Sequence, residues 1–176
     1  MNLPSITLVS YGFFEKGFLD LIAESVEQEF HCPLNLKEGH IDLSEYYDPA
    51  RRQYNGNGLL KFVDSLPSAE SCKTLGLFNV DLFIPILTYI FGQAFLGGRT
   101  GIASLYRLHN SGYGMETDDQ LLLTRFKKEV VHELGHSFGL IHCKNSTCVM
   151  RSSTYVEDID QKEHHFCHSC RSTLNL

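Results

Sequence analysis

Hydrophobic residues near the N-terminus follow two different periods. Ile6 to Val9 is a short β-branched and apolar run, which is typical of a buried strand. From Phe18 to Phe30 the apolar residues recur every three or four positions, as they do on one face of a helix. Leu34 to Lys37 can return as a second strand. This end of the chain is therefore predicted to form a strand, an amphipathic helix and another strand.

The middle of the chain reads mainly as sheet. His40 to Asn57 is polar and rich in turn residues, so we expect loops there, followed by a short helix at Leu59 to Leu66. Three apolar stretches then predict strands, with a turn at Gly97 and Gly98 before the third. These strands are Leu75 to Ile86, Thr88 to Phe95 and Ile102 to Leu108.

A second long helix is predicted from Thr117 to Phe138. Thr117 and Gln120 match a capping box, and apolar residues at helical spacing give the helix a core face. No Pro-, Gly- or Ser-rich linker divides the chain. We therefore expect one α+β domain over residues 1–176, with sheet and helices in residues 1–138 and a metal-rich tail in residues 139–176. The tail beyond Arg151 is too polar to fold by burial alone.

Composition and charge narrow the class of protein. A chain of 176 residues with 43% hydrophobic and 20% charged residues can form a real core, which excludes a disordered protein. The formal net charge of −6, without any basic run, argues against nucleic acid or anionic lipid as a partner. Met1 to Ser10 lacks the features of a signal peptide, so we expect a cytoplasmic protein.

One uncharged stretch needs to be tested as a membrane span. Leu82 to Gly98 approaches the length of a transmembrane helix, but Pro85 and several glycines interrupt it. Its Ile, Tyr, Phe and Thr content suits short buried strands better. We therefore expect no membrane segment.

A histidine motif spans residues 132–142. His132 and His136 are four residues apart, which places them one turn apart on one helix face, where both can reach the same ion. Gly139 comes where the helix should stop, and the turn that it allows can bring back His142 as a third ligand. Three neutral imidazoles leave zinc an open position for water, and Glu133 stands beside it as general base. The motif predicts a catalytic zinc site.

Four of the six cysteines form two close pairs in the tail. Cys143 with Cys148 and Cys167 with Cys170 have the spacing of a closed, structural zinc site with four thiolates. Two disulfides, or three cysteines with His164, His165 or His168, remain alternatives. Cys32 and Cys72 stand alone, and we interpret them as free core thiols. The cofactors expected are two zinc ions, one catalytic and one structural.

The extended histidine motif with Met150 downstream resembles the metzincins, where such a methionine lies under the catalytic zinc. The four tail cysteines make the chain similar to the archaemetzincins in particular. This resemblance extends to earlier segments, namely Arg51 to Asn55, Asp81 to Phe83, Phe91 to Ala94 and Ser104 to Leu108. It covers most of the chain.

The resemblance implies a compact zinc metallopeptidase with a mixed, twisted sheet and two long helices. It also implies an edge strand that binds an extended peptide, placed by position at Tyr89 to Phe95. Some metzincins have a tyrosine two residues after the methionine, whereas this chain has Ser152; Tyr155 is nearby but is not assigned a role.

The predicted function is hydrolysis of a peptide or protein substrate by a chain expected to be a monomer. Two other functions remain open. One is a zinc-stabilised peptide-binding module with little or no turnover. The other is a zinc hydrolase of a non-peptide substrate such as RNA, which the acidic composition disfavours.

Overall fold

The computed structural model describes residues 4–176, so the first three residues of the segment considered as a signal peptide lie outside it. The strands of the main sheet are β1 (Ser5–Tyr11), β2 (Leu34–Gly39), β5 (Cys72–Phe78), β8 (Gly92–Ala94) and β9 (Thr100–Ser104). Those of a smaller sheet are β3 (Tyr47–Asp48), β4 (Gln53–Asn55), β6 (Leu82–Ile84) and β7 (Leu87–Ile90). The α-helices are α1 (Lys16–Phe30), α2 (Gly56–Ser65), α3 (Asp119–Ser137), α4 (Val156–Gln161) and α5 (His168–Leu174).

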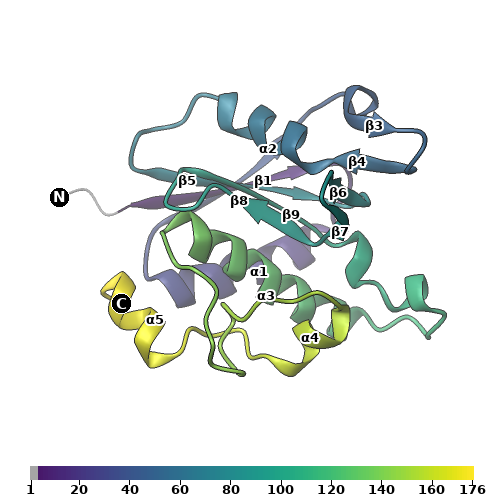
Figure 1. Cartoon of the computed structure of the whole chain (residues 1–176). Coiled ribbons are helices and arrows are strands. Elements are labelled where there is room, and N and C mark those ends of the chain that lie inside the picture. The colour runs from purple at the N-terminus through teal and green to yellow at the C-terminus, as the bar shows by residue number, and fades with distance from the viewer. Residues whose placement is uncertain (1–3) are drawn as a thin grey trace.

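The main sheet has the order β2-β1-β5-β9-β8, and only β8 runs antiparallel to its neighbour. Strand β1 contributes apolar side chains to both faces of this sheet. Ile6 and Leu8 belong to the hydrophobic core on one side, whereas Val9 and Tyr11 belong to the core on the other. The predicted mixed sheet is confirmed, with β8 at one edge (Figure 1).

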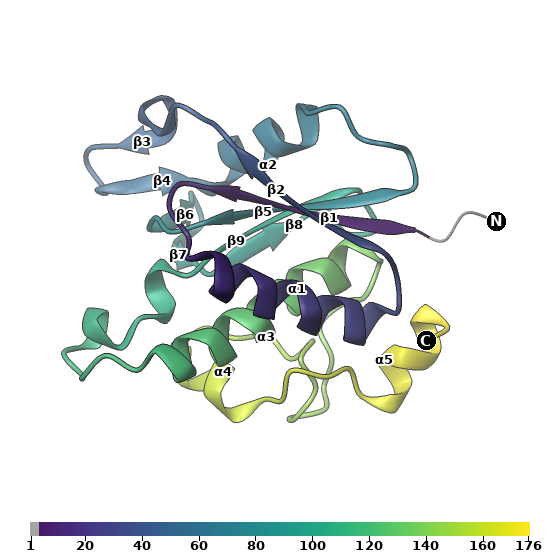
Figure 2. The same cartoon turned by 180° about the vertical axis from the view of Figure 1, so that it is seen from behind.

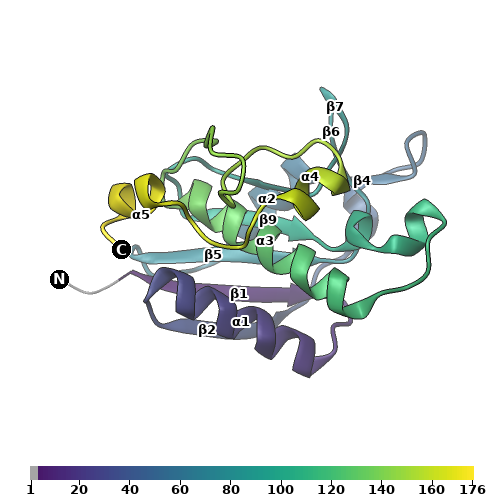
Figure 3. The same cartoon turned by 90° about the horizontal axis from the view of Figure 1, so that it is seen from below.

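Helices cover both faces of the main sheet. The two long helices, α1 and α3, lie side by side under one face, and α2 lies on the opposite face (Figures 1, 2 and 3). The larger core lies between α1, α3 and the sheet, where Phe126, Val130 and Leu134 of α3 are fully buried. Both long helices were predicted, but α3 is capped by Asp118, whose side chain accepts a hydrogen bond from the Leu121 amide, rather than by Thr117.

Two of the predicted strands are each split between the two sheets. The stretch 75–86 contains the end of β5 and all of β6, because the chain turns after Phe78 and the Val80 amide bonds to Ser104 Oγ. The stretch 88–95 likewise divides into β7 and β8 at Phe91. Apolar content predicted a buried strand from Leu75 to Ile86, which is right for the part in β5 but wrong for Ile86, which is 85% exposed; it also could not show where the chain changes sheets.

Other boundaries shift for local reasons. The third predicted strand ends at Ser104, after which residues 106–108 form a 3₁₀ turn. The region expected to be loops contains the short strands β3 and β4. Helix α2 begins at Gly56, earlier than predicted, because Asn55 caps it through a hydrogen bond from the Gly58 amide.

The polar tail crosses α3, contacts the C-terminal end of α1, and forms two short helices, α4 and α5 (Figure 3). Buried charges hold it there. Glu29 of α1 accepts hydrogen bonds from His165 Nδ1 at 2.8 Å, the Phe166 amide at 2.9 Å and Arg171 Nη2 at 2.8 Å. Arg125 of α3 makes a bidentate pair with Asp160. The tail therefore docks through charge-assisted hydrogen bonds as well as through apolar residues such as Val156 and Ile159.

The uncharged stretch 82–98 forms β6, β7, β8 and the loop after them. None of the helices in residues 4–176 has the length and apolar character needed to cross a bilayer.

Candidate active site and metal centres

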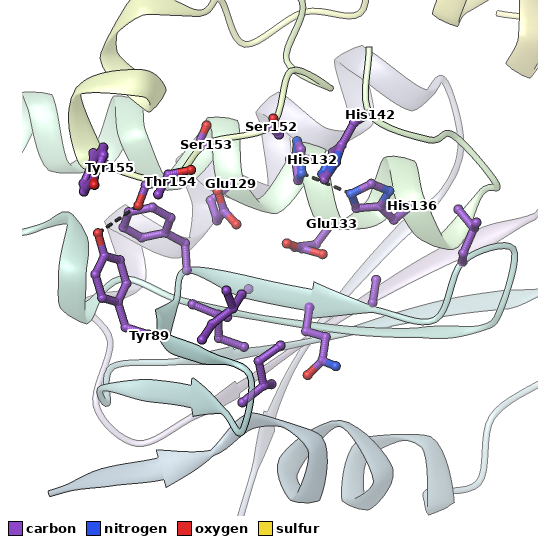
Figure 4. Close-up of a pocket in the computed structure, with 18 of the residues that line it drawn as sticks. Tyr89, Glu129, His132, Glu133, His136, His142, Ser152, Ser153, Thr154 and Tyr155 are labelled. Atoms are coloured by element: carbon purple, nitrogen blue, oxygen red, sulfur yellow. Dashed lines mark hydrogen bonds between the residues drawn. The ribbon is translucent and has the colours of Figure 1, made fainter. Parts of the chain in front are cut away.

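Three histidine side chains converge at the end of α3 (Figure 4). One nitrogen of each of His132, His136 and His142 lies within 4.8 Å of the others. His132 and His136 come from successive turns of α3, as their spacing predicted. The helix ends after Ser137, and Gly139 has φ of +99°, a left-handed conformation in which a side chain would be strained. This turn returns His142 to the site.

Backbone carbonyl groups fix the orientation of two of the imidazoles. His132 Nδ1 lies 2.8 Å from the Val149 oxygen, and His136 Nδ1 lies 2.7 Å from the Leu140 oxygen. A carbonyl only accepts, so each Nδ1 carries the proton and each Nε2 is left with its lone pair. The two Nε2 atoms are 3.1 Å apart, and two lone pairs at this separation repel each other unless a cation lies between them. The donor set therefore suits a metal ion.

Burial also favours the unprotonated imidazoles that a metal requires. It lowers the pKa of all three histidines, furthest for His132, where the Lys162 ammonium acts in the same direction. Lys162 is itself buried. Its Nζ donates to the Arg151 oxygen at 2.9 Å and lies 3.4 Å from His132 Nδ1.

Glu133 lies next to the histidines on the side of α3 that faces the sheet (Figure 4). It is buried, and its Oε2 has no hydrogen-bond partner within the described chain. Burial and the neighbouring Glu129 carboxylate raise the pKa of Glu133 well above its usual value, while Lys162 opposes this change. A buried carboxylate without a partner is costly, which is why burial raises its pKa, and a ligand or water at this oxygen would offset that cost.

Two close contacts show how tightly the neighbouring chain fits around α3. A Cβ added to Gly92 of β8 would lie 2.7 Å from Glu133 Cγ and 2.8 Å from Glu133 Oε1. A Cβ at Gly135 would overlap the sulfur of Met150, which is fully buried beneath the helix. Strand β8 and the methionine therefore pack directly against the helix that carries the motif.

The histidines open into a cleft of about 650 Å³. Strands β7 and β8 form one wall, and residues 152–155 form part of the other. Tyr89 Oη donates a hydrogen bond of 2.8 Å to the Thr154 oxygen and so joins the two walls (Figure 4). Tyr155 lines this end of the cleft, away from His136, and Ser152 lies nearer to the histidines.

The four tail cysteines form a second cluster, with their sulfurs within 4.8 Å of one another. The separations Cys143 to Cys167 and Cys148 to Cys170 are both 3.8 Å. Thiolates bound at about 2.3 Å to a tetrahedral zinc ion lie about 3.8 Å apart, so the cluster has zinc-site dimensions. A hydrogen bond from the Cys170 amide lowers the pKa of Cys167 to about 7, whereas burial raises that of Cys148.

The alternatives for the cysteine cluster are disfavoured. The six cysteines are all unpaired, and the cluster of converging ligand atoms consists of the four cysteines, without His164, His165 or His168. Cys32 and Cys72 are buried free thiols, as predicted.

Sequence reasoning did not identify Glu129 or Lys162 as parts of this region, whereas Tyr89 and Gly92 lie within the edge strand predicted at Tyr89 to Phe95. Glu129 could have been found, because it lies one turn before Glu133 on the same helix face. Lys162 reaches His132 only through the tertiary fold, and so does the bond from Tyr89 to the Thr154 oxygen, and no local sequence pattern predicts either contact.

Three converging imidazoles, a buried glutamate and a cleft bordered by a sheet edge together define the class of zinc metallopeptidases. Comparison with known proteins agrees and specifies the family. The model of peptidase family M54 matches residues 41–176. The chain therefore belongs to peptidase family M54, the archaemetzincins, and is a zinc-dependent peptidase.

Curated relatives cover nearly the whole chain. The archaemetzincin of Thermococcus kodakarensis is 35% identical over 96% of this chain and 94% of its own length. That of Halobacterium salinarum is 41% identical over 86% of this chain and 88% of its own length.

Solved structures give the same result. The archaemetzincin of Archaeoglobus fulgidus, complexed with malonate, has a TM-score of 0.79 at 33% identity and covers 95% of this chain and 98% of its own. A zinc-dependent peptidase from Methanocorpusculum labreanum has a TM-score of 0.86 at 29% identity, covering 97% of this chain and 100% of its own. The predicted family and metzincin-like α+β fold are thus confirmed.

The contact between Gly92 and Glu133 predicts that Gly92→Ala impairs catalysis more than metal binding. The added methyl group must displace the Glu133 side chain or strand β8, and a misplacement of about 1 Å can lower a rate about 100-fold. Steady-state peptidase kinetics and zinc content should show a large loss of kcat with zinc retained. Gly17→Ala is the matched control, because a Cβ there meets nothing within 4 Å. Equal kcat in the two variants would contradict the prediction.

The lowered pKa of His132 predicts acid sensitivity of the protein when the histidine site is metal-free. Below the usual histidine pKa of 6.5 the unfolded chain binds a proton at His132 that the folded chain does not, so stability falls as the pH falls. This group alone should remove about 1 kcal/mol of unfolding free energy between about pH 7.5 and pH 5.5. Urea unfolding at both pH values should show that His132→Gln loses less unfolding free energy on acidification than the wild type does. An equal loss in the two proteins would show that His132 is not the source of the acid sensitivity.

Proposed function

We propose that His132, His136 and His142 hold a catalytic zinc ion and that Glu133 is the general base for peptide hydrolysis. The observation that carries this proposal is the buried, unpartnered Glu133 Oε2 beside three imidazoles whose nitrogens converge, two of them with their Nε2 lone pairs turned toward each other. A zinc ion bound there supplies a Lewis acid for the scissile carbonyl and lowers the pKa of a coordinated water to about 7.

Residues of the chain orient the histidines, support the helix and transfer the proton. Val149 and Leu140 keep two imidazoles in the tautomer that presents Nε2. Met150 fills the space under Gly135 and so supports the helix from below. Glu133 takes the proton from the attacking water and then passes it to the leaving amine, which is the usual role of a carboxylate in this position. Glu129 and Lys162 set the charge around it.

The substrate has a place to bind along β8. Residues 91, 93 and 95 direct their backbone groups to β9. The Phe91 oxygen accepts from the Ser104 amide, and the Phe95 amide donates to the Thr100 oxygen. Between them, Gln93 pairs with Ile102. In an antiparallel ladder the intervening residues point the other way, so Gly92 and Ala94 offer theirs to the cleft. An extended peptide can add to this edge as a further strand.

The four cysteines are proposed to hold a second, structural zinc ion, giving two zinc ions per chain. Within one domain, residues 1–138 then supply the sheet, Glu133 and two histidine ligands, and residues 139–176 supply His142, Met150 and the cysteines. The two sites are linked, because His142 and Cys143 are adjacent and the Cys143 amide donates to the Met150 oxygen at 2.9 Å.

Glu133→Gln tests the base. The amide preserves the size of the side chain but cannot take up a proton, so peptide hydrolysis should fall about 10²–10⁴-fold with zinc content unchanged. Turnover of a mixed peptide library and metal analysis of the same samples provide the measurement. Full activity with zinc bound would exclude Glu133 as base. A wild-type protein that carries zinc and turns over no peptide would instead favour a binding module.

Metal stoichiometry tests the two sites and their linkage. Wild type should carry about two zinc ions per chain, and His136→Ala about one. Cys148→Ser should lose the structural ion and also weaken zinc at the histidine site about 10–100-fold, because it loosens the segment that carries His142. Competitive chelator titration measures the second effect. Unchanged affinity at the histidine site would show that the two sites are independent.

A further inference from the structure

Two large apolar side chains are exposed beside His136 at one end of the cleft. Leu96, in the loop between β8 and β9, is 60% exposed, and Ile141, in the turn before His142, is 70% exposed. Both line the cleft that contains the histidines. Apolar side chains that share an open cleft commonly mark a binding surface.

The backbone holds both side chains in place. The Gly97 amide donates to the His136 oxygen at 2.9 Å and so ties the loop of Leu96 to the end of α3. Lys73 strengthens the same junction, since its Nζ donates to the Gly98 oxygen at 2.7 Å and to the Ser137 oxygen at 2.9 Å. The loop is also closed on itself by the Gly98 amide and the Phe95 oxygen, 2.8 Å apart. A side chain that docks here meets a surface that is already ordered.

The position of Ile141 follows from the turn that delivers the third histidine. After Gly139, Leu140 is buried in the core and His142 points to the other two histidines. Ile141 lies between them and is left exposed at the edge of the cleft. Its apolar surface is therefore available to a ligand and contributes little to the core.

Charge distribution in the cleft disfavours an acidic occupant at this end. Among the described residues that line the cleft, none is Lys or Arg, and the two carboxylates belong to Glu129 and Glu133 on α3. An acidic substrate side chain beside Leu96 and Ile141 would lose water without gaining a cationic partner. A large apolar side chain would gain burial.

The direction of the substrate follows from pairing with β8. Antiparallel strands pair slightly more strongly than parallel ones, and β8 runs from Gly92 toward Leu96. The N-terminal part of an antiparallel substrate therefore lies toward Leu96. We propose that Leu96 and Ile141 form an apolar subsite for one of the two residues preceding the scissile bond, so that the substrates are peptides with Leu, Ile, Met or Phe there. This inference rests on the proposed peptidase function.

Cleavage of a mixed peptide library by the zinc-loaded protein tests the subsite, with the cut ends identified by mass spectrometry. Large apolar residues should be enriched at one of the two positions before the cut. In the double variant Leu96→Ser with Ile141→Ser this enrichment should vanish. The ratio of kcat/KM between an apolar peptide and its alanine counterpart should fall about tenfold or more. Phe13→Ser is the matched control, because Phe13 is 88% exposed and lies outside the cleft lining.

A binding measurement separates failure of the subsite from failure of the enzyme. Zinc-loaded Glu133→Gln should bind the apolar peptide about tenfold more tightly than its alanine counterpart, and the added double substitution should abolish this difference. Binding of this kind without wild-type turnover would leave the subsite intact and refute the peptidase mechanism. Three results would contradict the proposed subsite. One is turnover without enrichment of apolar residues, and another is enrichment only after the cut. The third is an enrichment before the cut that persists in the double variant.

Discussion

Two hydrogen bonds from imidazole nitrogens to backbone carbonyls determine the character of the whole centre. His132 and His136 are presented by α3, but the oxygens of Val149 and Leu140 decide which nitrogen of each ring faces the cleft. Both carbonyls belong to the chain that follows the helix. The helix brings the rings together, and the returning segment turns them into a donor set with the right protonation. Anything that shifts this segment changes the site, even when α3 stays intact.

The chain that follows α3 is held in place because charged groups are buried where it meets α1 and α3. Glu29 accepts three hydrogen bonds from the tail, and Arg125 pairs with Asp160. Lys162 lies behind His132 and bonds to the carbonyl next to Met150. Such groups are expensive to bury, and leaving one without its partner costs more than the contact gains. They tolerate few alternative arrangements, which suits a tail that must place a ligand accurately.

Local features of the site were predictable from the sequence, whereas its assembly was not. Helical periodicity located α3, the spacing of His132 and His136 placed them on one face, and Gly139 predicted the left-handed turn that the structure has. The strands were harder, because the stretches 75–86 and 88–95 were each predicted as one strand although each serves two sheets; Asn79 and Asp81 mark the change of sheet in the first stretch, but period and composition alone did not show it. Long-range partners were also missed: Lys162 is thirty residues from His132 in the chain, and no periodic pattern connects them.

The three bonds to Glu29 bear on when the molecule becomes active. Their donors lie 136, 137 and 142 residues further along the chain, so they are synthesised long after the residues of α1. Contacts of such long sequence separation form late, because the chain entropy of closing the loop must be overcome first. A nascent chain that lacks residues 165–171 has neither these bonds nor Cys167 and Cys170. The site proposed for hydrolysis therefore lacks this anchor until residue 171 has been synthesised.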